Sequence, residues 1–302
     1  MLKEGILQLA QRDSVRHLAQ LPIAQRVVQR FVAGETLDQA MAVTHTLNSR
    51  HISVSLDHLG ENTTDAREAS ATADDYTHII ERIQGEGAEA NISVKLTALG
   101  LDIGEDLCRQ NLTRVLRSAQ EAGVFVRVDM EGSAYTERTV DMVIEAHKTF
   151  AQVGTVMQTA LLRTPENLER LIDAGVRVRL VKGAYLEPPS IAYARKADVD
   201  NAYLRLLRPL LERGVYPAIA THDERMINAA IRFAQEREIP HARFEFQMLY
   251  GIRRDLQERL AATGYNMRVY VPFGSQWYPY LMRRMAERPA NLIFVLGNTF
   301  RG

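Results

Sequence analysis

One stretch near the C-terminal end carries polar side chains at a helical repeat, namely Tyr280, Arg283, Arg284 and Glu287. Their spacing places them on one face of a helix that has Pro279 in its first turn and ends before Pro289. Two neighbouring guanidinium groups offer planar donor forks that match a small carboxylate. An exposed helix face with a surface ion pair would show the same pattern, so the residues alone leave both interpretations open.

Polar side chains also interrupt two apolar runs earlier in the chain. Lys95 lies inside the run Ser93–Thr97, where it can serve as an ion-pair partner, an imine-forming lysine or a substrate clamp. Asp129 alternates with apolar neighbours and shares a pleat face with Arg127. It can form an internal salt bridge, or it can orient a lysine or an arginine of a site.

The run from Arg177 to Gly183 is the most unusual of these segments. Arg179 falls in its middle, and Gly183 and Ala184 leave room for a ligand to approach the backbone. A structural ladder of ion pairs is one interpretation. A guanidinium aimed at a polar ring or an anion accounts for more of the pattern.

His222, which follows Thr221, can be a capping or core residue, a metal ligand or a general base. The eight histidines are scattered without a metal-like spacing, so we expect no metal site. The sequence also lacks Gly-x-Ser-x-Gly and Walker-type phosphate loops.

These residues belong to a regular alternation of short β-rich runs and longer helical patterns. The β-rich runs are 51–57, 91–97, 125–131, 154–159, 177–183, 216–222, 244–249 and 267–271. The helical patterns between them are 65–84, 104–122, 137–151, 164–174, 198–213, 223–238 and 252–262.

Eight repeats of strand and helix predict a closed parallel (β/α)8 barrel of the TIM type, in the α/β class. An open doubly wound sheet is the rival, and the lack of Gly-x-Gly-x-x-Gly weakens its dinucleotide-binding version. We expect residues 1–50 to form an N-terminal helical segment on the barrel and residues 51–302 to form the barrel. Its functional groups should lie at the carboxyl ends of the strands.

Composition points to an ordinary soluble globular protein. The 37 Lys and Arg balance the 37 Asp and Glu, which gives no support to nucleic acid as a partner. The single cysteine, Cys108, fits packing in a reducing compartment. No signal peptide and no apolar run of about 18 residues is found, so we expect a cytoplasmic protein.

Seven motifs, in this order, resemble the proline dehydrogenase family of the monofunctional bacterial kind. They are 56–61 (LDHLGE), 93–98 (SVKLTA), 128–131 (VDME), 179–185 (RLVKGAY), 220–223 (ATHD), 244–251 (FEFQMLYG) and 270–291. The resemblance spans residues 51 to 291 and implies a distorted (β/α)8 barrel that holds FAD at the carboxyl ends of its strands. It also implies oxidation of L-proline to 1-pyrroline-5-carboxylate by hydride transfer from proline C5 to flavin N5.

The resemblance implies a role for each matching residue. Arg283 and Arg284, together with Lys95, should bind the proline carboxylate, with Glu287 bracing the arginines. Tyr270 and Tyr280 should wall the proline ring. Arg179 should lie near flavin N5, and Asp129 should hold the neighbouring polar network. Asp57 and Glu61 should gate the site. The implied FAD contacts are Met130, Gln158, Arg179, Val181, Lys182, Gly183, Ala184, Thr221 and His222.

The resemblance also implies partners. Electrons should pass to a membrane quinone, which makes peripheral contact with the inner face of the cell membrane an expectation. A separate pyrroline-5-carboxylate dehydrogenase should act next, because this chain carries no aldehyde dehydrogenase half.

Two other classes of protein share parts of the pattern. A barrel aldolase or lyase would use Lys95 or Lys182 to form an imine, and a binding scaffold would only pair its polar strand ends.

Overall fold

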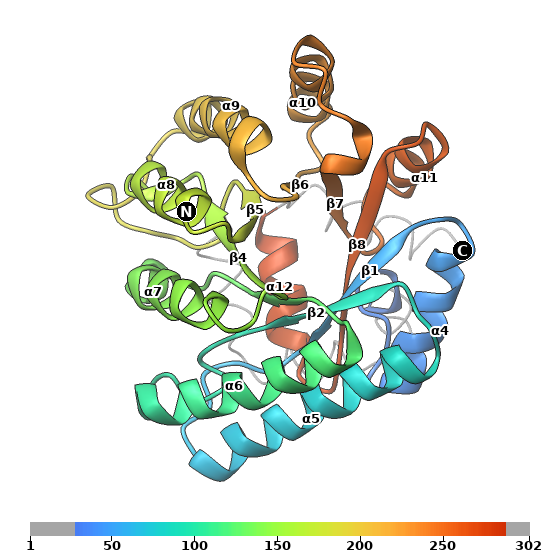
Figure 1. Cartoon of the computed structure of the whole chain (residues 1–302), viewed down its shortest axis with the longest axis vertical. Coiled ribbons are helices and arrows are strands. Elements are labelled where there is room, and N and C mark those ends of the chain that lie inside the picture. The colour runs from blue at the N-terminus through green and yellow to red at the C-terminus, as the bar shows by residue number, and fades with distance from the viewer. Residues whose placement is uncertain (1–27, 288–302) are drawn as a thin grey trace.

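The computed structural model describes residues 28–287, without the side chains of residues 283–287. Within this part, eight parallel strands pair in sequence order and close into a barrel, as the alternation predicts (Figure 1). The strands are β1 (Ser53–His58), β2 (Ala90–Val94), β3 (Val126–Val128), β4 (Val153–Gln158), β5 (Arg177–Val181), β6 (Ala218–Ala220), β7 (Glu245–Leu249) and β8 (Asn266–Phe273).

Helices follow the first seven strands and surround the barrel (Figure 1). They are α5 (Ala66–Gly85), α6 (Glu105–Ala122), α7 (Thr136–His147), α8 (Thr164–Asp173), α9 (Lys196–Arg213), α10 (Glu224–Glu236) and α11 (Arg254–Ala262), with the short 3₁₀ turns η1 (Ser133–Tyr135) and η2 (His241–Arg243). Each expected helix is present, with ends that differ by a few residues.

The strands are shorter than the β-rich runs at several carboxyl ends. The run 91–97 was expected to be a strand throughout, but β2 ends at Val94, and the run 125–131 contains only the three residues of β3. Lys95 and Asp129 therefore follow their strands. A strand ends where its ladder ends, and the paired residues of β2 and β3 stop at Val94 and Val128. Beyond Val94 the chain turns, with the Leu99 N–H donating to the carbonyls of Lys95 and Leu96.

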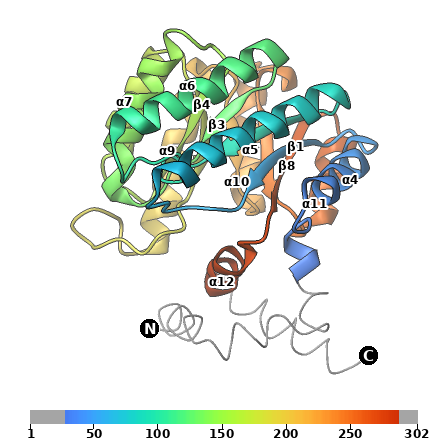
Figure 2. The same cartoon turned by 90° about the horizontal axis from the view of Figure 1, so that it is seen from below.

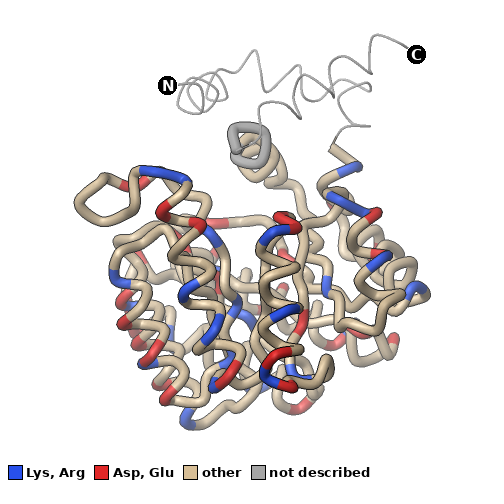
Figure 3. The backbone as a smooth tube through the Cα atoms, turned by 90° about the horizontal axis from the view of Figure 1, so that it is seen from above, with Lys and Arg blue, Asp and Glu red and all other residues tan. Residues whose placement is uncertain are grey.

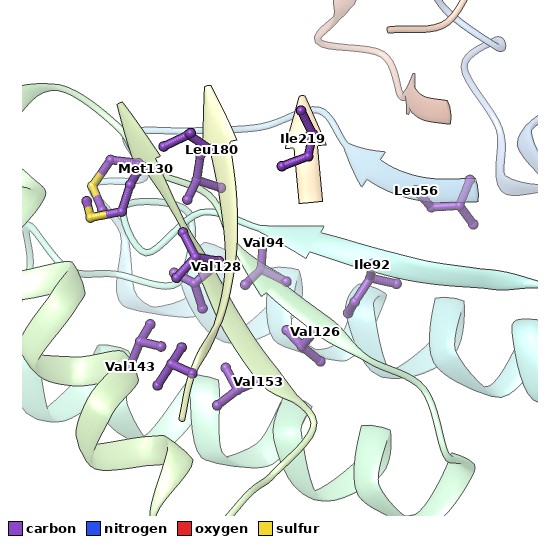
Figure 4. Close-up of a cluster of buried hydrophobic side chains, with 14 of the residues drawn as sticks. Leu56, Ile92, Val94, Val126, Val128, Met130, Val143, Val153, Leu180 and Ile219 are labelled. Carbon is purple, nitrogen blue, oxygen red and sulfur yellow. The ribbon is translucent and has the colours of Figure 1, made fainter. Parts of the chain in front are cut away.

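One side of every strand is apolar and faces the helices. Figure 4 shows Ile92, Val94, Val126 and Val128 between the sheet and the surrounding helices. These residues are 0% exposed and belong to one continuous core. Each fully buried aliphatic side chain contributes about 1.5–3 kcal/mol from the loss of water contact. Cys108 is also fully buried, which confirms that it packs in the core.

The other side of the strands is polar and faces the barrel axis. Near the amino ends of the strands, Arg268 contacts Glu245 at 3.0 Å, and both side chains are largely buried. Arg127 is 1% exposed and donates to the carbonyl oxygens of Thr155 and Arg177 at 3.0 and 2.7 Å. Burial lowers the pKa of the Arg127 guanidinium well below its usual range. Arg127 and Asp129 thus share a face, as predicted, but Arg127 makes its contacts toward the amino ends of the strands and Asp129 lies at their carboxyl ends.

Two helices do not belong to the repeating pattern. The first, α4 (Leu37–Asn48), precedes the barrel, carries a Thr36–Gln39 capping box and packs against β1 and β8. The second, α12 (Trp277–Glu287), follows β8. Figure 1 shows it across the middle of the barrel, and the turned view of Figure 2 shows it beyond one end of the barrel.

Residues just before α4 hold the start of α12. The Ala33 N–H donates to the Pro272 carbonyl and the Gly274 N–H to the Gly34 carbonyl, each at 2.9 Å. The Trp277 indole donates to Glu35 at 3.0 Å. Trp277 and Leu281, four residues apart on α12, are both buried. The side chain of Met285 lies outside the described part of the chain.

The expected division into 1–50 and 51–302 remains a prediction, and residues 1–27 and 288–302 lie outside the described part. In the view of Figure 3, acidic and basic positions alternate over the outer helices. No helix among the described residues is long and apolar enough to cross a membrane.

The buried Glu245–Arg268 pair gives the barrel a pH-dependent stability. Burial opposes the charge of Glu245, but the nearby Arg268 outweighs it, so the carboxyl pKa lies below its usual value of 4.5. The unfolded chain then binds more protons, and the contribution of the pair is lost as pH falls below about 4.5 through the folded pKa. Glu245→Gln should lower the free energy of unfolding by about 3 kcal/mol at pH 7, because it leaves a buried guanidinium unpaired.

Urea unfolding at pH 7 and at pH 3 to 4 measures the free energy of unfolding of the wild type and of Glu245→Gln. The gap between the wild type and Glu245→Gln should shrink in acid. Glu258→Gln is the control, since Glu258 pairs with Arg50 on the exposed surface and should change little. A gap that stays constant with pH would contradict a charged Glu245.

Candidate active site

A cavity of about 670 Å³ opens at the carboxyl ends of the strands, beneath α12. Its walls come from the strand ends, from the loops after them and from Tyr280 of α12. The lining residues are Asp57, Lys95, Asp129, Met130, Glu131, Val156, Gln158, Arg179, Val181, Lys182, Gly183, Ala184, Tyr185, Lys196, Ala220, Thr221, His222, Asp223, Glu224, Gln247, Met248, Leu249, Arg253, Tyr270 and Tyr280. The described residues predicted for the site thus meet in one cavity, except for Glu61.

Asp129 stands at the centre of the polar contacts in this cavity. One of its oxygens accepts from Arg179 Nη1 at 2.8 Å, and the other accepts from the Tyr270 hydroxyl at 2.7 Å. Asp129 directly follows β3, whereas Arg179 and Tyr270 lie within β5 and β8, so the contacts cross the barrel interior. Asp129 and Arg179 form an internal salt bridge, and the same contact orients the arginine, so both roles left open for Asp129 are compatible with the geometry.

Arg179 is fixed from several directions. Its Nη2 atom lies 3.3 Å from the hydroxyls of Ser55 and Ser93, and its guanidinium carbon lies 5.2 Å from the centre of the Tyr270 ring. The side chain is 6% exposed. Burial and the carboxylates of Asp129 and Asp57 raise the pKa of the Tyr270 phenol well above its usual range, so Tyr270 stays protonated and acts as a donor.

Lys95 forms the second buried pair of the cavity. Its ammonium lies 2.6 Å from Asp57, and the two side chains are 9% and 1% exposed. Burial opposes the charge of Lys95, but Asp57 and Asp129 more than offset this effect, and the pKa of Lys95 is raised above its usual range. A lysine held as an ammonium is a poor nucleophile, so the geometry disfavours an imine-forming role for it.

The wall formed by the ends of β4 and β5 presents backbone to the cavity. Gln158 donates to the carbonyl oxygen of Glu131 at 2.8 Å, which fixes its amide. Gly183 has φ +113°, and a Cβ there would lie 3.0 Å from Gln158 Oε1 and 3.2 Å from Ala160 Cβ. Only glycine fits this position without strain, and its backbone stays open to a ligand.

The loop after β6 contributes Thr221, His222 and Asp223. The ring of His222 accepts from the Leu249 N–H through Nε2 at 2.9 Å, which ties this loop to β7. Asp223 caps α10 by accepting from the Arg225 N–H, and it contacts Lys182 at 2.9 Å. His222 therefore has a structural contact at the cavity wall. No group of three or more His, Cys, Asp or Glu among the described residues could hold a metal ion.

The helix face that carries the two arginines is described only in part. Tyr280 is 7% exposed and lines the cavity, so this position of the face turns toward the site. Arg283, Arg284 and Glu287 lie in α12, but their side chains are outside the described part of the chain. Asp57 is buried against Lys95, and Glu61 does not line the cavity, so their predicted gating role stays a prediction.

Several lining residues were not predicted as site residues. They include Tyr185, Lys196, Asp223, Gln247 and Arg253. Tyr185, Asp223 and Gln247 stand inside motifs that the sequence singles out; Tyr185 and Asp223 follow strands, and Gln247 lies within β7. Lys196 begins α9 after a long loop, and Arg253 directly precedes α11; no local pattern marks either residue.

Comparisons with known proteins point to one family. The family model for proline dehydrogenase matches residues 40–296. Proline dehydrogenase 1 of Bacillus subtilis subsp. natto is 38% identical over 296 residues, which cover 98% of each chain. Proline dehydrogenase of Deinococcus radiodurans is 40% identical over 311 residues, covering 100% of this chain and 99% of its own.

A solved structure also resembles the fold. It is proline utilization A (PutA) from Bdellovibrio bacteriovorus, inactivated by N-propargylglycine, with a TM-score of 0.83 and 27% sequence identity. The alignment covers 91% of this chain but 34% of the other, so this chain spans about a third of the length of that structure.

The contacts of Asp129 predict a measurable loss of stability. Asp129→Asn should lower the free energy of unfolding by about 2–3 kcal/mol, because the buried Arg179 loses its carboxylate. Tyr270→Phe removes a single hydroxyl and should cost about 1 kcal/mol. Urea unfolding of the ligand-free protein measures both. Equal effects of the two substitutions would show that Asp129 does not hold Arg179.

Proposed function

Since this chain belongs to the proline dehydrogenase family, an oxidoreductase family of proline catabolism, we propose that it oxidises L-proline to 1-pyrroline-5-carboxylate with FAD. One observation carries the proposal: motifs that lie far apart in the sequence converge on a single cavity. They bring paired charges, an open backbone wall and an aromatic side chain to the same place.

The residues of the cavity fit a flavin. A cavity of about 670 Å³ lies within the range of cofactor pockets. Gly183 leaves the backbone accessible where a side chain would meet Gln158, which suits close approach of a flat ring. In the proposed arrangement Met130, Gln158, Val181, Lys182, Gly183, Ala184, Thr221 and His222 contact the cofactor, and Arg179 lies near N5. Bound FAD would supply the acceptor at N5 for the hydride that leaves proline C5.

The chain itself contributes alignment and electrostatics. Asp129 holds Arg179 in one orientation and keeps its positive charge compensated while the site is empty of substrate. Tyr270, fixed by its hydrogen bond to Asp129, offers a rigid wall for the proline ring, and Tyr280 closes the ring from α12. No side chain needs to form a covalent bond with the substrate.

The proline carboxylate is proposed to bind Arg283 and Arg284, with Lys95 as a third cation and Glu287 as a brace for the arginines. Support comes from Tyr280, which brings the same helix face to the cavity. Because Asp57 already binds Lys95, the Lys95 ammonium would contact both Asp57 and the carboxylate of the substrate. Asp57 and Glu61 are proposed as the gate that pairs with the arginines after the substrate leaves.

The electrons are proposed to pass to a membrane quinone during peripheral contact with the inner face of the cell membrane. A separate pyrroline-5-carboxylate dehydrogenase would oxidise the product.

The first test is the absorption spectrum of the purified full-length protein. We expect a yellow protein whose flavin bands bleach on addition of L-proline without oxygen and return on addition of a soluble quinone analogue. A colourless protein that is trapped by borohydride with a carbonyl substrate would refute the proposal and favour a lyase that uses Lys95 or Lys182.

The second test addresses the carboxylate clamp. Arg284→Lys keeps the charge but removes the bidentate fork, so it should raise KM for L-proline at least about tenfold, corresponding to about 1.4 kcal/mol. Steady-state kinetics with a quinone analogue measures KM and kcat. Arg117→Lys makes the same chemical change on α6, away from the cavity, and should leave KM unchanged. An unchanged KM in Arg284→Lys would remove this arginine from the clamp.

A further inference from the structure

The loop between β1 and α5, residues 59–64, contacts both the barrel and α12, and we call it the β1 loop. Its first residue, Leu59, is 6% exposed and donates its N–H to the last carbonyl of β8 at 2.8 Å. The Leu59 side chain belongs to one buried apolar cluster with Trp277, Tyr280 and Leu281 of α12. The β1 loop is therefore part of the surface against which the start of α12 packs.

The middle of the β1 loop is held by Thr97, which follows β2. The Asn62 N–H donates to the Thr97 hydroxyl oxygen at 3.1 Å. Asn62 has φ +58°, a left-handed conformation that asparagine adopts more readily than most residues. The hydrogen bond thus fixes the β1 loop three residues after Leu59.

Thr97 is in turn anchored to the carboxylate of Glu131. The Thr97 hydroxyl donates to Glu131 Oε2 at 2.6 Å, and the Thr97 N–H donates to Glu131 Oε1 at 3.2 Å. The exposed fractions of the two residues are 0% and 4%. One hydroxyl therefore donates to Glu131 and accepts from Asn62 at the same time. We call Asn62, Thr97 and Glu131 the loop anchor.

Thr97 lies behind the wall of the cavity. Glu131 lines the cavity, whereas Thr97 and Asn62 do not. The bond from Thr97 to the carboxylate is charge-assisted, so it is stronger than a bond between neutral groups. Its loss would also leave a buried carboxylate oxygen without its donor. Any effect of the Thr97 hydroxyl on a ligand in the cavity must therefore pass through the β1 loop or Glu131.

We propose that Thr97 is a positioning residue for α12: through the β1 loop it keeps the helix docked on the barrel, and it thereby sets the affinity for the substrate. The effect on affinity rests on the proposed function, in which α12 supplies the carboxylate clamp. If α12 is docked in only a fraction of the molecules, the apparent dissociation constant rises by the reciprocal of that fraction. Bound substrate would hold the helix in place, so kcat should change less than KM.

Trp277 reports whether α12 is docked. It is the only tryptophan of the chain, it is the first residue of α12 and it is 5% exposed. Its indole donates to Glu35 at 3.0 Å. A helix that leaves its docked position would expose this indole to water. Quenching of tryptophan fluorescence by acrylamide, measured on the full chain without proline, therefore follows docking and needs no turnover.

Thr97→Val removes the hydroxyl and keeps the shape of the side chain. We expect the Stern–Volmer quenching constant to rise at least about twofold and KM for L-proline to rise about tenfold, with kcat within about threefold of the wild type. Thr97→Ser restores the hydroxyl and should return both the quenching constant and KM toward the wild-type values.

Thr155→Val is the matched control. Thr155 is also 0% exposed, and its hydroxyl donates to the Val128 carbonyl at 2.9 Å inside the barrel wall. This variant loses a buried hydroxyl as well, but it should change neither quenching nor KM. A second variant, Leu59→Ala, reduces the contact with α12 and leaves the loop anchor intact. It should raise both the quenching constant and KM, as Thr97→Val does.

Several outcomes would overturn the inference. Quenching in Thr97→Val equal to that of the wild type would show that Thr97 does not hold α12. Increased quenching with an unchanged KM would show that docking of α12 does not set the affinity for the substrate. Equal effects of Thr155→Val and Thr97→Val would reduce both to a loss of stability. A wild type that does not oxidise L-proline would refute the proposed function instead, and the quenching comparison would still decide whether Thr97 holds α12.

Discussion

The pairing of charges inside the barrel is the constraint on which the rest of the structure depends. A barrel interior built from alternate strand residues is narrow, and here it holds Asp57, Lys95, Asp129 and Arg179. Any one of these groups would be costly alone in such a place, because a buried charge without a partner is poorly solvated. Each has a partner within 2.8 Å from a different strand end. The strands must therefore close in one register for all pairs to form.

Such pairs add little net stability, because the cost of removing charges from water consumes most of their attraction. Their main effect is to fix the positions of the charged side chains. Arg179 is held by Asp129 and flanked by two serine hydroxyls and the Tyr270 ring, which leaves its guanidinium few alternative orientations. The apolar layer between the strands and the helices supplies the stability that this polar interior does not. The outer faces of the strands thus supply stability, and the inner faces of the same strands position the polar groups of the cavity.

The fold could be predicted from the sequence because a parallel barrel repeats one local pattern eight times. The residues of the cavity could be predicted to the extent that they follow a strand, as Lys95, Asp129 and Lys182 do. Partners could not be predicted, because register decides them: Asp129 shares a face with Arg127 of the strand that it follows, yet it binds Arg179 of β5. Lys196 was missed because α9 begins after a long loop, and only the folded chain brings its first residue to the cavity.

Ring closure joins the first and last strands of the barrel, with Ser53 beside Arg268 and His58 beside Phe273. More than 200 residues separate these partners in the chain, so the seam between β1 and β8 requires the largest loss of chain entropy of any strand pair. During synthesis on the ribosome, β1 and α4 have no partner at this seam until β8 has emerged. The nascent protein consequently passes through a stage in which an open edge strand is exposed to other chains, and this is the point at which a chaperone would offer protection.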